Sequence, residues 1–184
     1  TCIEAGLKHK QNLEQCADEV HIAVLGDKLQ KVDMHLRKIK KNSKITYTKG
    51  SNLFGDTPTF ETHHLDPRDM VTLESLVGHD ALYDFIKQDV QGAEILIMQG
   101  SPQIFKRATY VLQEVNLYKD LNYSLIPDVD EMDTYMKNLG FLKNSRKKKA
   151  SLAADSSSPQ RDNAISIIVY YNPPPIRRSA INYG

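Results

Sequence analysis

The octet Lys87-Gln88-Asp89-Val90-Gln91-Gly92-Ala93-Glu94 decides the fold that this sequence predicts. A strand-like apolar run at 82–86 precedes it, and a helix-like run at 95–98 follows it directly. Glycine lets the backbone come close to a ligand, and open parallel sheets bind ligands beyond the carboxyl ends of their strands. A strand that ends in Asp89, turns through Gly92 and enters a helix through Glu94 therefore indicates a ligand-binding corner of an α/β sheet.

Strand-like and helix-like segments alternate outward from the octet. The expected strands are 20–25, 82–89, 109–115 and 164–171, and the expected helices are 3–17, 72–77, 93–99 and 128–139. This alternation predicts one mainly parallel sheet with right-handed crossovers and a last strand that returns antiparallel. Residues 32–36 and 45–47 predict an antiparallel extension joined through the basic turn 38–44. Asp66-Pro67 is expected to end an extended segment at 59–65.

The octet and its surroundings resemble a known family. Its pattern is similar to the Lys-x-Asp-x-Glu-Gly-x-Glu signature of the FkbM-type methyltransferases, which use S-adenosylmethionine, with Gln91 in place of the usual Glu. The run 20–27 looks like the family's third strand with its Leu-Gly-Asp turn, and 113–116 stands where the fifth strand ends in Glu. In this order and spacing across residues 3–171, the matches imply an α/β fold with the Rossmann-like sheet of class I methyltransferases.

Two parts of the family pattern find no match in the sequence. There is no Gly-x-Gly for the cofactor turn, and residues 1–17 resemble the helix that follows the second, acid-ended strand. We therefore expect an N-terminally incomplete methyltransferase domain over 1–172, with a mobile loop at 144–163, and a Pro-rich tail at 173–184. Taken alone, this fragment is expected to be inactive and to bind S-adenosylmethionine very weakly.

Carboxylates at two strand ends are the candidate catalytic residues. Asp89 closes one strand, and Glu114 and Asn116 close another, so neighbouring strands would bring them to one sheet edge. Methyl transfer needs the acceptor aligned with the methyl group and, for a hydroxyl, a carboxylate that takes the proton. We expect Asp89 to contact the methionine end of the cofactor or the acceptor, and Glu114 to bind the acceptor or act as the base.

The resemblance implies further site residues. It assigns cofactor binding to Val24, Leu25, Asp89 and Gly92, and substrate binding to Glu94 and Asn116. Each polar residue also has a structural alternative. Asp89 could cap the turn by accepting N–H groups of residues 91–93, Glu94 could favour the helix macrodipole from its first turn, and Asn116 could cap a loop.

Composition limits the classes of function. The net charge of +1 gives no strong field toward nucleic acid or a membrane, and no apolar run reaches the roughly 20 residues that span a bilayer. No Cys-x-x-Cys or helical His pair predicts a zinc site, so no metal is expected, although Mg²⁺ at Asp89 and Glu114 stays open. Cys2 and Cys16 cannot pair within one helix, which favours a reducing, cytoplasmic compartment.

The leading prediction is S-adenosylmethionine-dependent methyl transfer to an oxygen of a small molecule or a glycan. A non-catalytic Rossmann-like binding or interaction module is the alternative, and the absence of Gly-x-Gly-x-x-Gly disfavours an NAD-type dehydrogenase. The basic cluster 146–149 is expected to be a solvated loop tip, with a docking patch for an anionic substrate or partner as the alternative.

Overall fold

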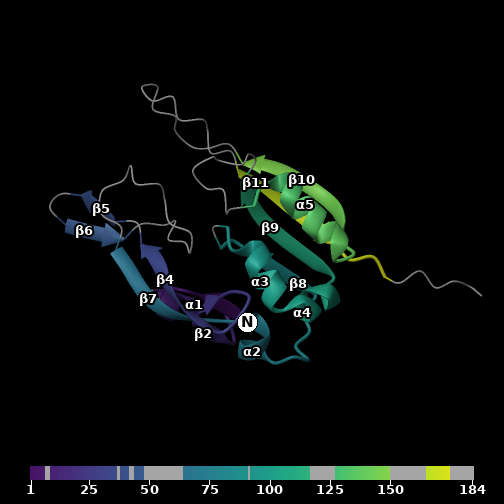
Figure 1. Ribbon diagram of the computed structural model, residues 1–184. Helices are drawn as coiled ribbons and strands as arrows, with labels where there is room; N and C mark the ends of the chain where they lie inside the picture. Colours follow the sequence, from purple (N-terminus) through teal and green to yellow (C-terminus); the bar gives the residue numbers. More distant parts are fainter. Residues whose placement is uncertain are drawn as a thin grey trace, which may run out of the picture.

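The computed structural model describes residues 1–6, 9–36, 38–41, 44–47, 64–90, 92–116, 127–149 and 165–174. These residues form a mixed α/β structure with several sheets (Figure 1). Among the described helices, none combines the length and the apolar character that a membrane crossing requires.

The largest sheet has four strands in the order β10-β11-β9-β8. They are β8 (Phe85–Gln88), β9 (Tyr110–Asn116), β10 (Leu142–Lys149) and β11 (Ile165–Tyr171). Strands β8 and β9 are parallel, whereas β11 is antiparallel to both β9 and β10. The expected parallel pair around the octet and the antiparallel last strand are therefore both confirmed.

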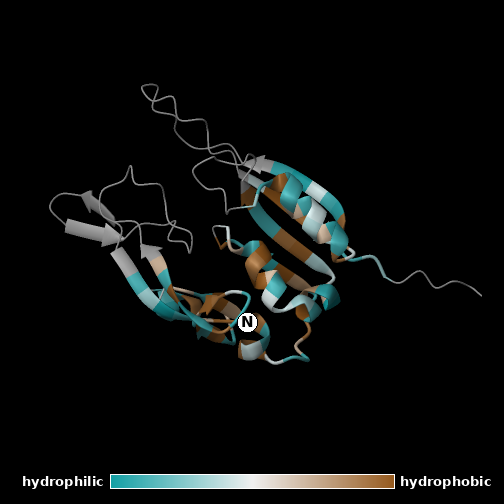
Figure 2. Cartoon of the chain, in the orientation of Figure 1, coloured by the Kyte–Doolittle hydropathy of each residue, from teal (hydrophilic) through white to brown (hydrophobic). Residues whose placement is uncertain are grey.

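Three helices cover one face of this sheet (Figure 1): α3 (Glu94–Gly100), α4 (Pro102–Arg107) and α5 (Val129–Asn138). Their buried side chains meet the inward side chains of β9 and β11 in one core, which contains Met98, Ile104, Phe105, Met132, Met136, Val111, Val115, Ile168 and Tyr170. Figure 2 colours much of α3 and the middle of β9 as hydrophobic, whereas α5 alternates between hydrophilic and hydrophobic residues. On the opposite face, Phe85 and Tyr110 remain exposed at 53% and 39%.

The expected helices at 72–77, 93–99 and 128–139 are confirmed to within one residue at each end. The side chain of Asp128 accepts the N–H groups of Asp130 and Glu131. The Glu131 carboxylate in turn accepts the backbone N–H of Asp128, which completes a capping box for α5. Helix α2 (Leu73–Val77) is capped by Thr72 and ends at Gly78, whose φ of 91° suits glycine.

The expected helix at 3–17 is wrong. Residues Cys2–Glu4 form strand β1, parallel to β2 (Val20–Ile22). Of the residues in this range that the structure describes, Lys10–Leu13 form the α-helix, α1. Ile3 packs against the main core, and the Glu4 carboxylate accepts the Gly6 N–H at 2.7 Å, which turns the chain immediately after the strand. Tertiary packing of a short apolar segment outweighs a weak helical stripe here.

The expected strand 20–25 divides between two sheets. After β2, Ala23 donates its N–H to the Glu4 carbonyl, and β3 (Val24–Leu25) then pairs parallel with β7 (His64–Val71). Strands 20–25, 82–89 and 109–115 do not share one sheet, because β2 and β3 pair with β1 and β7. The sheets are mixed, so a single mainly parallel sheet is not confirmed.

Glycines allow this part of the chain to pack closely against α3. A Cβ on Gly100 would lie 2.2 Å from the Gly26 carbonyl oxygen, and a Cβ on Gly26 would lie 2.1 Å from the Met70 sulfur. Both approaches are closer than any side chain allows. The turn after β3 therefore fits directly against the end of α3.

Asp66-Pro67 does not end the extended segment, contrary to the expectation from sequence. Strand β7 runs through it and pairs antiparallel with β4 (Gln30–Leu36), with Pro67 opposite Asp33. On the other side of β7, strand β3 pairs with Met70 and Val71 and does not reach Pro67. The missing N–H of Pro67 is therefore tolerated at this position. The hairpin of β5 (Lys38–Lys41) and β6 (Lys44–Tyr47) is present, but β4 pairs with β7 rather than with β6.

The basic cluster 146–149 lies in a strand, so the expected loop at 144–163 is wrong for its first residues. Strand β10 reaches Lys149 and pairs with β11, with Arg146 opposite Ile168. Figure 2 colours much of β10 as hydrophilic. Polar and basic side chains are common on edge strands, where they block pairing with other chains. Residues 150–164 lie outside the described residues.

Candidate functional site

The carboxyl ends of β8 and β9 lie side by side. These strands are parallel, and Gln88 is directly opposite Gln113, so Asp89 and Glu114 follow at the same level. Gln88 and Gln113 are buried on the helix-covered face. Because side chains alternate along a strand, Glu114 belongs to the opposite face. Asp89 lies on that face too, because its carboxylate is 3.2 Å from the ammonium of Lys87, two residues earlier in the chain. The predicted meeting of the two carboxylates at one sheet edge follows from this register.

The turn after Asp89 is held by Glu94. Its Oε1 accepts the N–H groups of Val90 and Gly92, each at 3.3 Å, and Gly92 has a φ of 103°. Glu94 is only 1% exposed, and burial raises the pKa of its carboxyl group, with a smaller contribution from the negative charge of Asp89. For Glu94 the geometry therefore favours the structural role, in a form that differs from the expected macrodipole effect.

The structural alternative for Asp89 was that it caps the turn by accepting N–H groups of residues 91–93. One of these groups, the Gly92 N–H, donates to the Glu94 carboxyl group. Asp89 itself is exposed at the edge of the sheet. Its expected role at the cofactor is compatible with this position and stays a prediction.

A third carboxylate, which sequence reasoning missed, ends β1. Glu4 closes a strand that runs parallel to β2, and an acidic residue at the end of a parallel strand is the group that binds ribose hydroxyls in dinucleotide folds. Strand β1 lies beside the main body, because Ile3 packs on the main core and the Tyr83 hydroxyl is 3.3 Å from the Thr1 hydroxyl. This strand was missed because residues 3–17 were expected to form a helix; Glu4 followed by Ala5 and Gly6 was the available signal.

The family described as the methyltransferase FkbM domain matches residues 3–143. The chain belongs to this family. Comparisons with curated proteins and with solved structures gave no match. Membership of the FkbM family indicates methyl transfer as the general activity.

The remaining predicted site residues of this FkbM domain are less informative. Val24 is 5% exposed and packs with Met34 and Met70, and Leu25 packs against the main core. Both side chains pack in hydrophobic clusters, and cofactor binding by these two residues stays a prediction. Asn116 ends β9, and its side chain lies outside what the structure describes. Among the described residues, no group of three His, Cys, Asp or Glu side chains could hold a metal ion.

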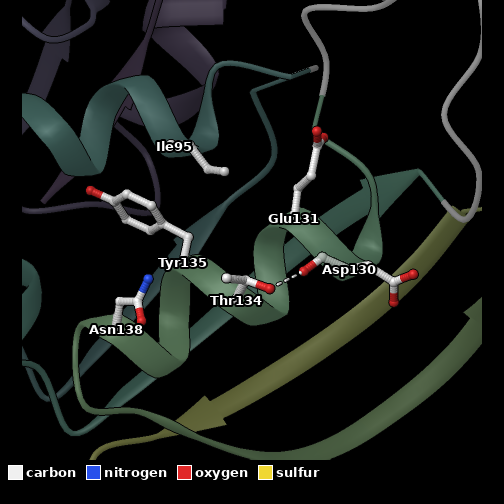
Figure 3. A pocket seen from close by; sticks show the side chains of 6 residues that line it. All are labelled: Ile95, Asp130, Glu131, Thr134, Tyr135 and Asn138. Atoms are coloured by element: carbon white, nitrogen blue, oxygen red, sulfur yellow. Dashed lines mark hydrogen bonds between the residues drawn. The ribbon is translucent and has the colours of Figure 1, made fainter.

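A hollow of about 400 Å³ lies between α3 and α5 (Figure 3). Its lining comes from the first turn of α3 and from one side of α5: Ile95, Asp130, Glu131, Thr134, Tyr135 and Asn138. Tyr135 also packs against the core, and burial raises the pKa of its hydroxyl. The Thr134 hydroxyl donates to the Asp130 carbonyl at 2.8 Å, as drawn in Figure 3. The hollow lies on the helix-covered side, whereas Asp89 and Glu114 belong to the other face.

Proposed function

We propose that this FkbM domain takes part in S-adenosylmethionine-dependent methyl transfer to an oxygen of a small molecule or a glycan. The observation that carries the proposal is the position of Asp89 and Glu114 at the same level of two neighbouring parallel strands, beside the Gly92 turn. Ligands of open α/β sheets bind at such strand ends. When bound, S-adenosylmethionine supplies a methyl group on a positively charged sulfur.

The residues present fit this cofactor. Asp89 offers an exposed carboxylate at the end of β8, which suits the ammonium or sulfonium charge at the methionine end. Glu4 offers a carboxylate at the end of β1, which suits ribose hydroxyls. The Gly92 turn brings the backbone, without a Cβ, to the same edge.

Glu114 is the proposed base. S-adenosylmethionine, when held there, would supply the methyl group to the acceptor oxygen, and its sulfur would keep the electron pair of the broken carbon–sulfur bond. The acceptor hydroxyl loses its proton to the Glu114 carboxylate, which is half-buried on the face that Asp89 shares. A base in this role typically contributes about 10²–10⁴-fold to the rate.

The test is transfer of a labelled methyl group from S-adenosylmethionine, by the full-length protein, to a mixture of hydroxyl-bearing small molecules and glycans. Labelled product together with S-adenosylhomocysteine supports the proposal. A folded full-length protein that transfers no methyl group, with or without binding of the cofactor, would contradict the proposal and favour the non-catalytic binding or interaction module.

We also propose a reducing compartment such as the cytoplasm. Both Cys2 and Cys16 are free thiols in the structure, and unpaired thiols are typical of reducing compartments. Mass spectrometry of the protein isolated with a thiol-alkylating reagent tests this, because two alkylated cysteines are expected.

A further inference from the structure

Two glutamine side chains are buried together beneath the candidate site. Gln88 in β8 and Gln113 in β9 are 4% and 0% exposed, and they occupy directly opposite positions in the parallel pair. The Gln113 Nε2 donates to the Gln88 Oε1 at 2.6 Å. Both positions lie among apolar side chains of the core, where leucine or valine is the ordinary occupant.

The amide pair is connected to the turn. The Gln88 Nε2 donates to the main-chain carbonyl of Glu94 at 3.5 Å, and the Glu94 side chain in turn accepts the N–H groups of Val90 and Gly92. A continuous path of polar contacts therefore runs from β9, through Gln88, to the first turn of α3 and the loop that carries Asp89. The Gln113 Nε2 also lies 3.7 Å from the Met98 sulfur, which ties it to the same helix.

An apolar pair at these two positions would be at least as stable. The Gln113 Oε1 is buried and has no hydrogen-bond partner among the described residues. An unsatisfied buried acceptor is unfavourable, whereas replacing both partners of a buried hydrogen bond by apolar groups of similar shape is close to neutral or stabilising. Local departures of this kind from the best packing are expected where a structure serves a ligand site.

We propose that Gln88 and Gln113 are positioning residues that fix the turn from Asp89 to Gly92 in the geometry that the cofactor needs. This inference rests on the proposed function, because that function supplies the ligand that the turn would bind. Gln88 holds the first turn of α3 through the Glu94 carbonyl, and Gln113 holds Gln88. Asp89 then leaves β8 at a fixed angle, next to Gln88 in the chain and beside Glu114 across the sheet.

Amide hydrogen exchange tests the positioning directly, without methyl transfer. We compare the wild-type chain with the double variant Gln88→Leu/Gln113→Leu, with Met132→Leu as a control in the same core but away from the turn. In the double variant we expect the amides of Val90 and Gly92 to exchange roughly fivefold faster, the factor implied by the loss of one net hydrogen bond. The amides of β11 and the melting temperature should remain unchanged, or the melting temperature should rise. Met132→Leu should leave the turn amides unchanged.

Three outcomes would overturn the proposal. Unchanged exchange at Val90 and Gly92 would show that the amide pair does not hold the turn. Faster exchange of β11 and the turn alike, with a lower melting temperature, would show that the pair only stabilises the core. The same exchange pattern in Met132→Leu would show that the turn responds to any core change. If the double variant does not fold, Gln88→Met/Gln113→Met decides in the same way, because it keeps the side-chain lengths and removes both amides.

Isothermal titration with S-adenosylmethionine separates this proposal from the proposed function. In the full-length protein, the double variant should bind the cofactor at least fivefold more weakly than wild type, with Met132→Leu unchanged. Absence of binding by the wild type would contradict the proposed function alone, and hydrogen exchange would still decide whether the glutamines hold the turn. Equal affinity of the double variant and wild type would contradict the positioning role while leaving the function standing.

Discussion

The Oε1 atom of Glu94 lies 3.3 Å from the backbone nitrogen of Gly92, and Glu94 is buried. A carboxylate that enters α3 thus holds the turn that leaves β8, and the same atom also accepts the N–H of Val90. Asp89, at the start of the same turn, is exposed at the edge of the sheet.

Glu114→Gln should lower methyl transfer by about 10²–10⁴-fold, because a neutral amide cannot take the proton of the acceptor hydroxyl. The half-buried side chain keeps its size, so the melting temperature should change little. Steady-state rates of the full-length protein check this, with Glu14→Gln, at the exposed end of α1, as the matched control. A full rate in Glu114→Gln would remove this residue from the catalytic step.

Gly92→Ala should destabilise the protein by about 1–3 kcal/mol, because φ at this position is 103° and a Cβ is strained there. Gly140→Ala is the matched control, since Gly140 has a φ of 98° and open space around it at the end of α5. Urea unfolding should give similar losses for both variants. Only Gly92→Ala should also weaken S-adenosylmethionine binding; equal affinities would show that the turn does not contribute to the cofactor site.

Glu94→Gln should change how stability depends on pH. Burial raises the pKa of Glu94 in the folded state above its ordinary value of 4.5, with Asp89 adding to this effect. As pH rises from 4.5, the unfolded chain therefore releases this proton first, and the contribution of Glu94 to the free energy of unfolding falls until the folded-state pKa is passed. Glutamine removes this dependence, because its amide does not titrate.

Urea unfolding at a series of pH values checks this. The free energy of unfolding of wild type, minus that of Glu94→Gln, should decline as pH rises from 4.5 and then become constant. Because the other titratable groups are common to both proteins, their effects cancel in the difference. A difference that grows with pH would mean that the turn amides lower the pKa of Glu94 more than burial raises it.

Much of the region around the octet could be predicted from sequence. Strand β8, the turn at Gly92, helix α3 and the start of α5 at Asp128 follow from local signals, which are an apolar run, a glycine and a residue that can cap a helix. The convergence of Asp89 and Glu114 also followed, because adjacent parallel strands end at the same edge.

Other features depend on contacts that are distant in sequence. Strand β1 exists because Ile3 packs on a core formed by later residues, and assigning that segment to a helix concealed Glu4. The basic residues of β10 indicated a loop, but pairing with β11 makes them an edge strand. Gln88 and Gln113 would be assigned to an exposed strand surface by polarity alone, and only the sheet register shows that they face each other in the core.

The most direct test of the account is the affinity of the full-length protein for S-adenosylmethionine, compared between wild type, Asp89→Asn and Asp80→Asn by isothermal titration. Asp80 is an exposed acid in the loop before β8 and serves as the matched control for charge. Loss of a charged contact predicts binding roughly 10- to 100-fold weaker in Asp89→Asn, with Asp80→Asn equal to wild type and all melting temperatures unchanged. Equal affinities in all three proteins, or no binding by folded wild type, would contradict the placement of the cofactor at the Asp89 corner.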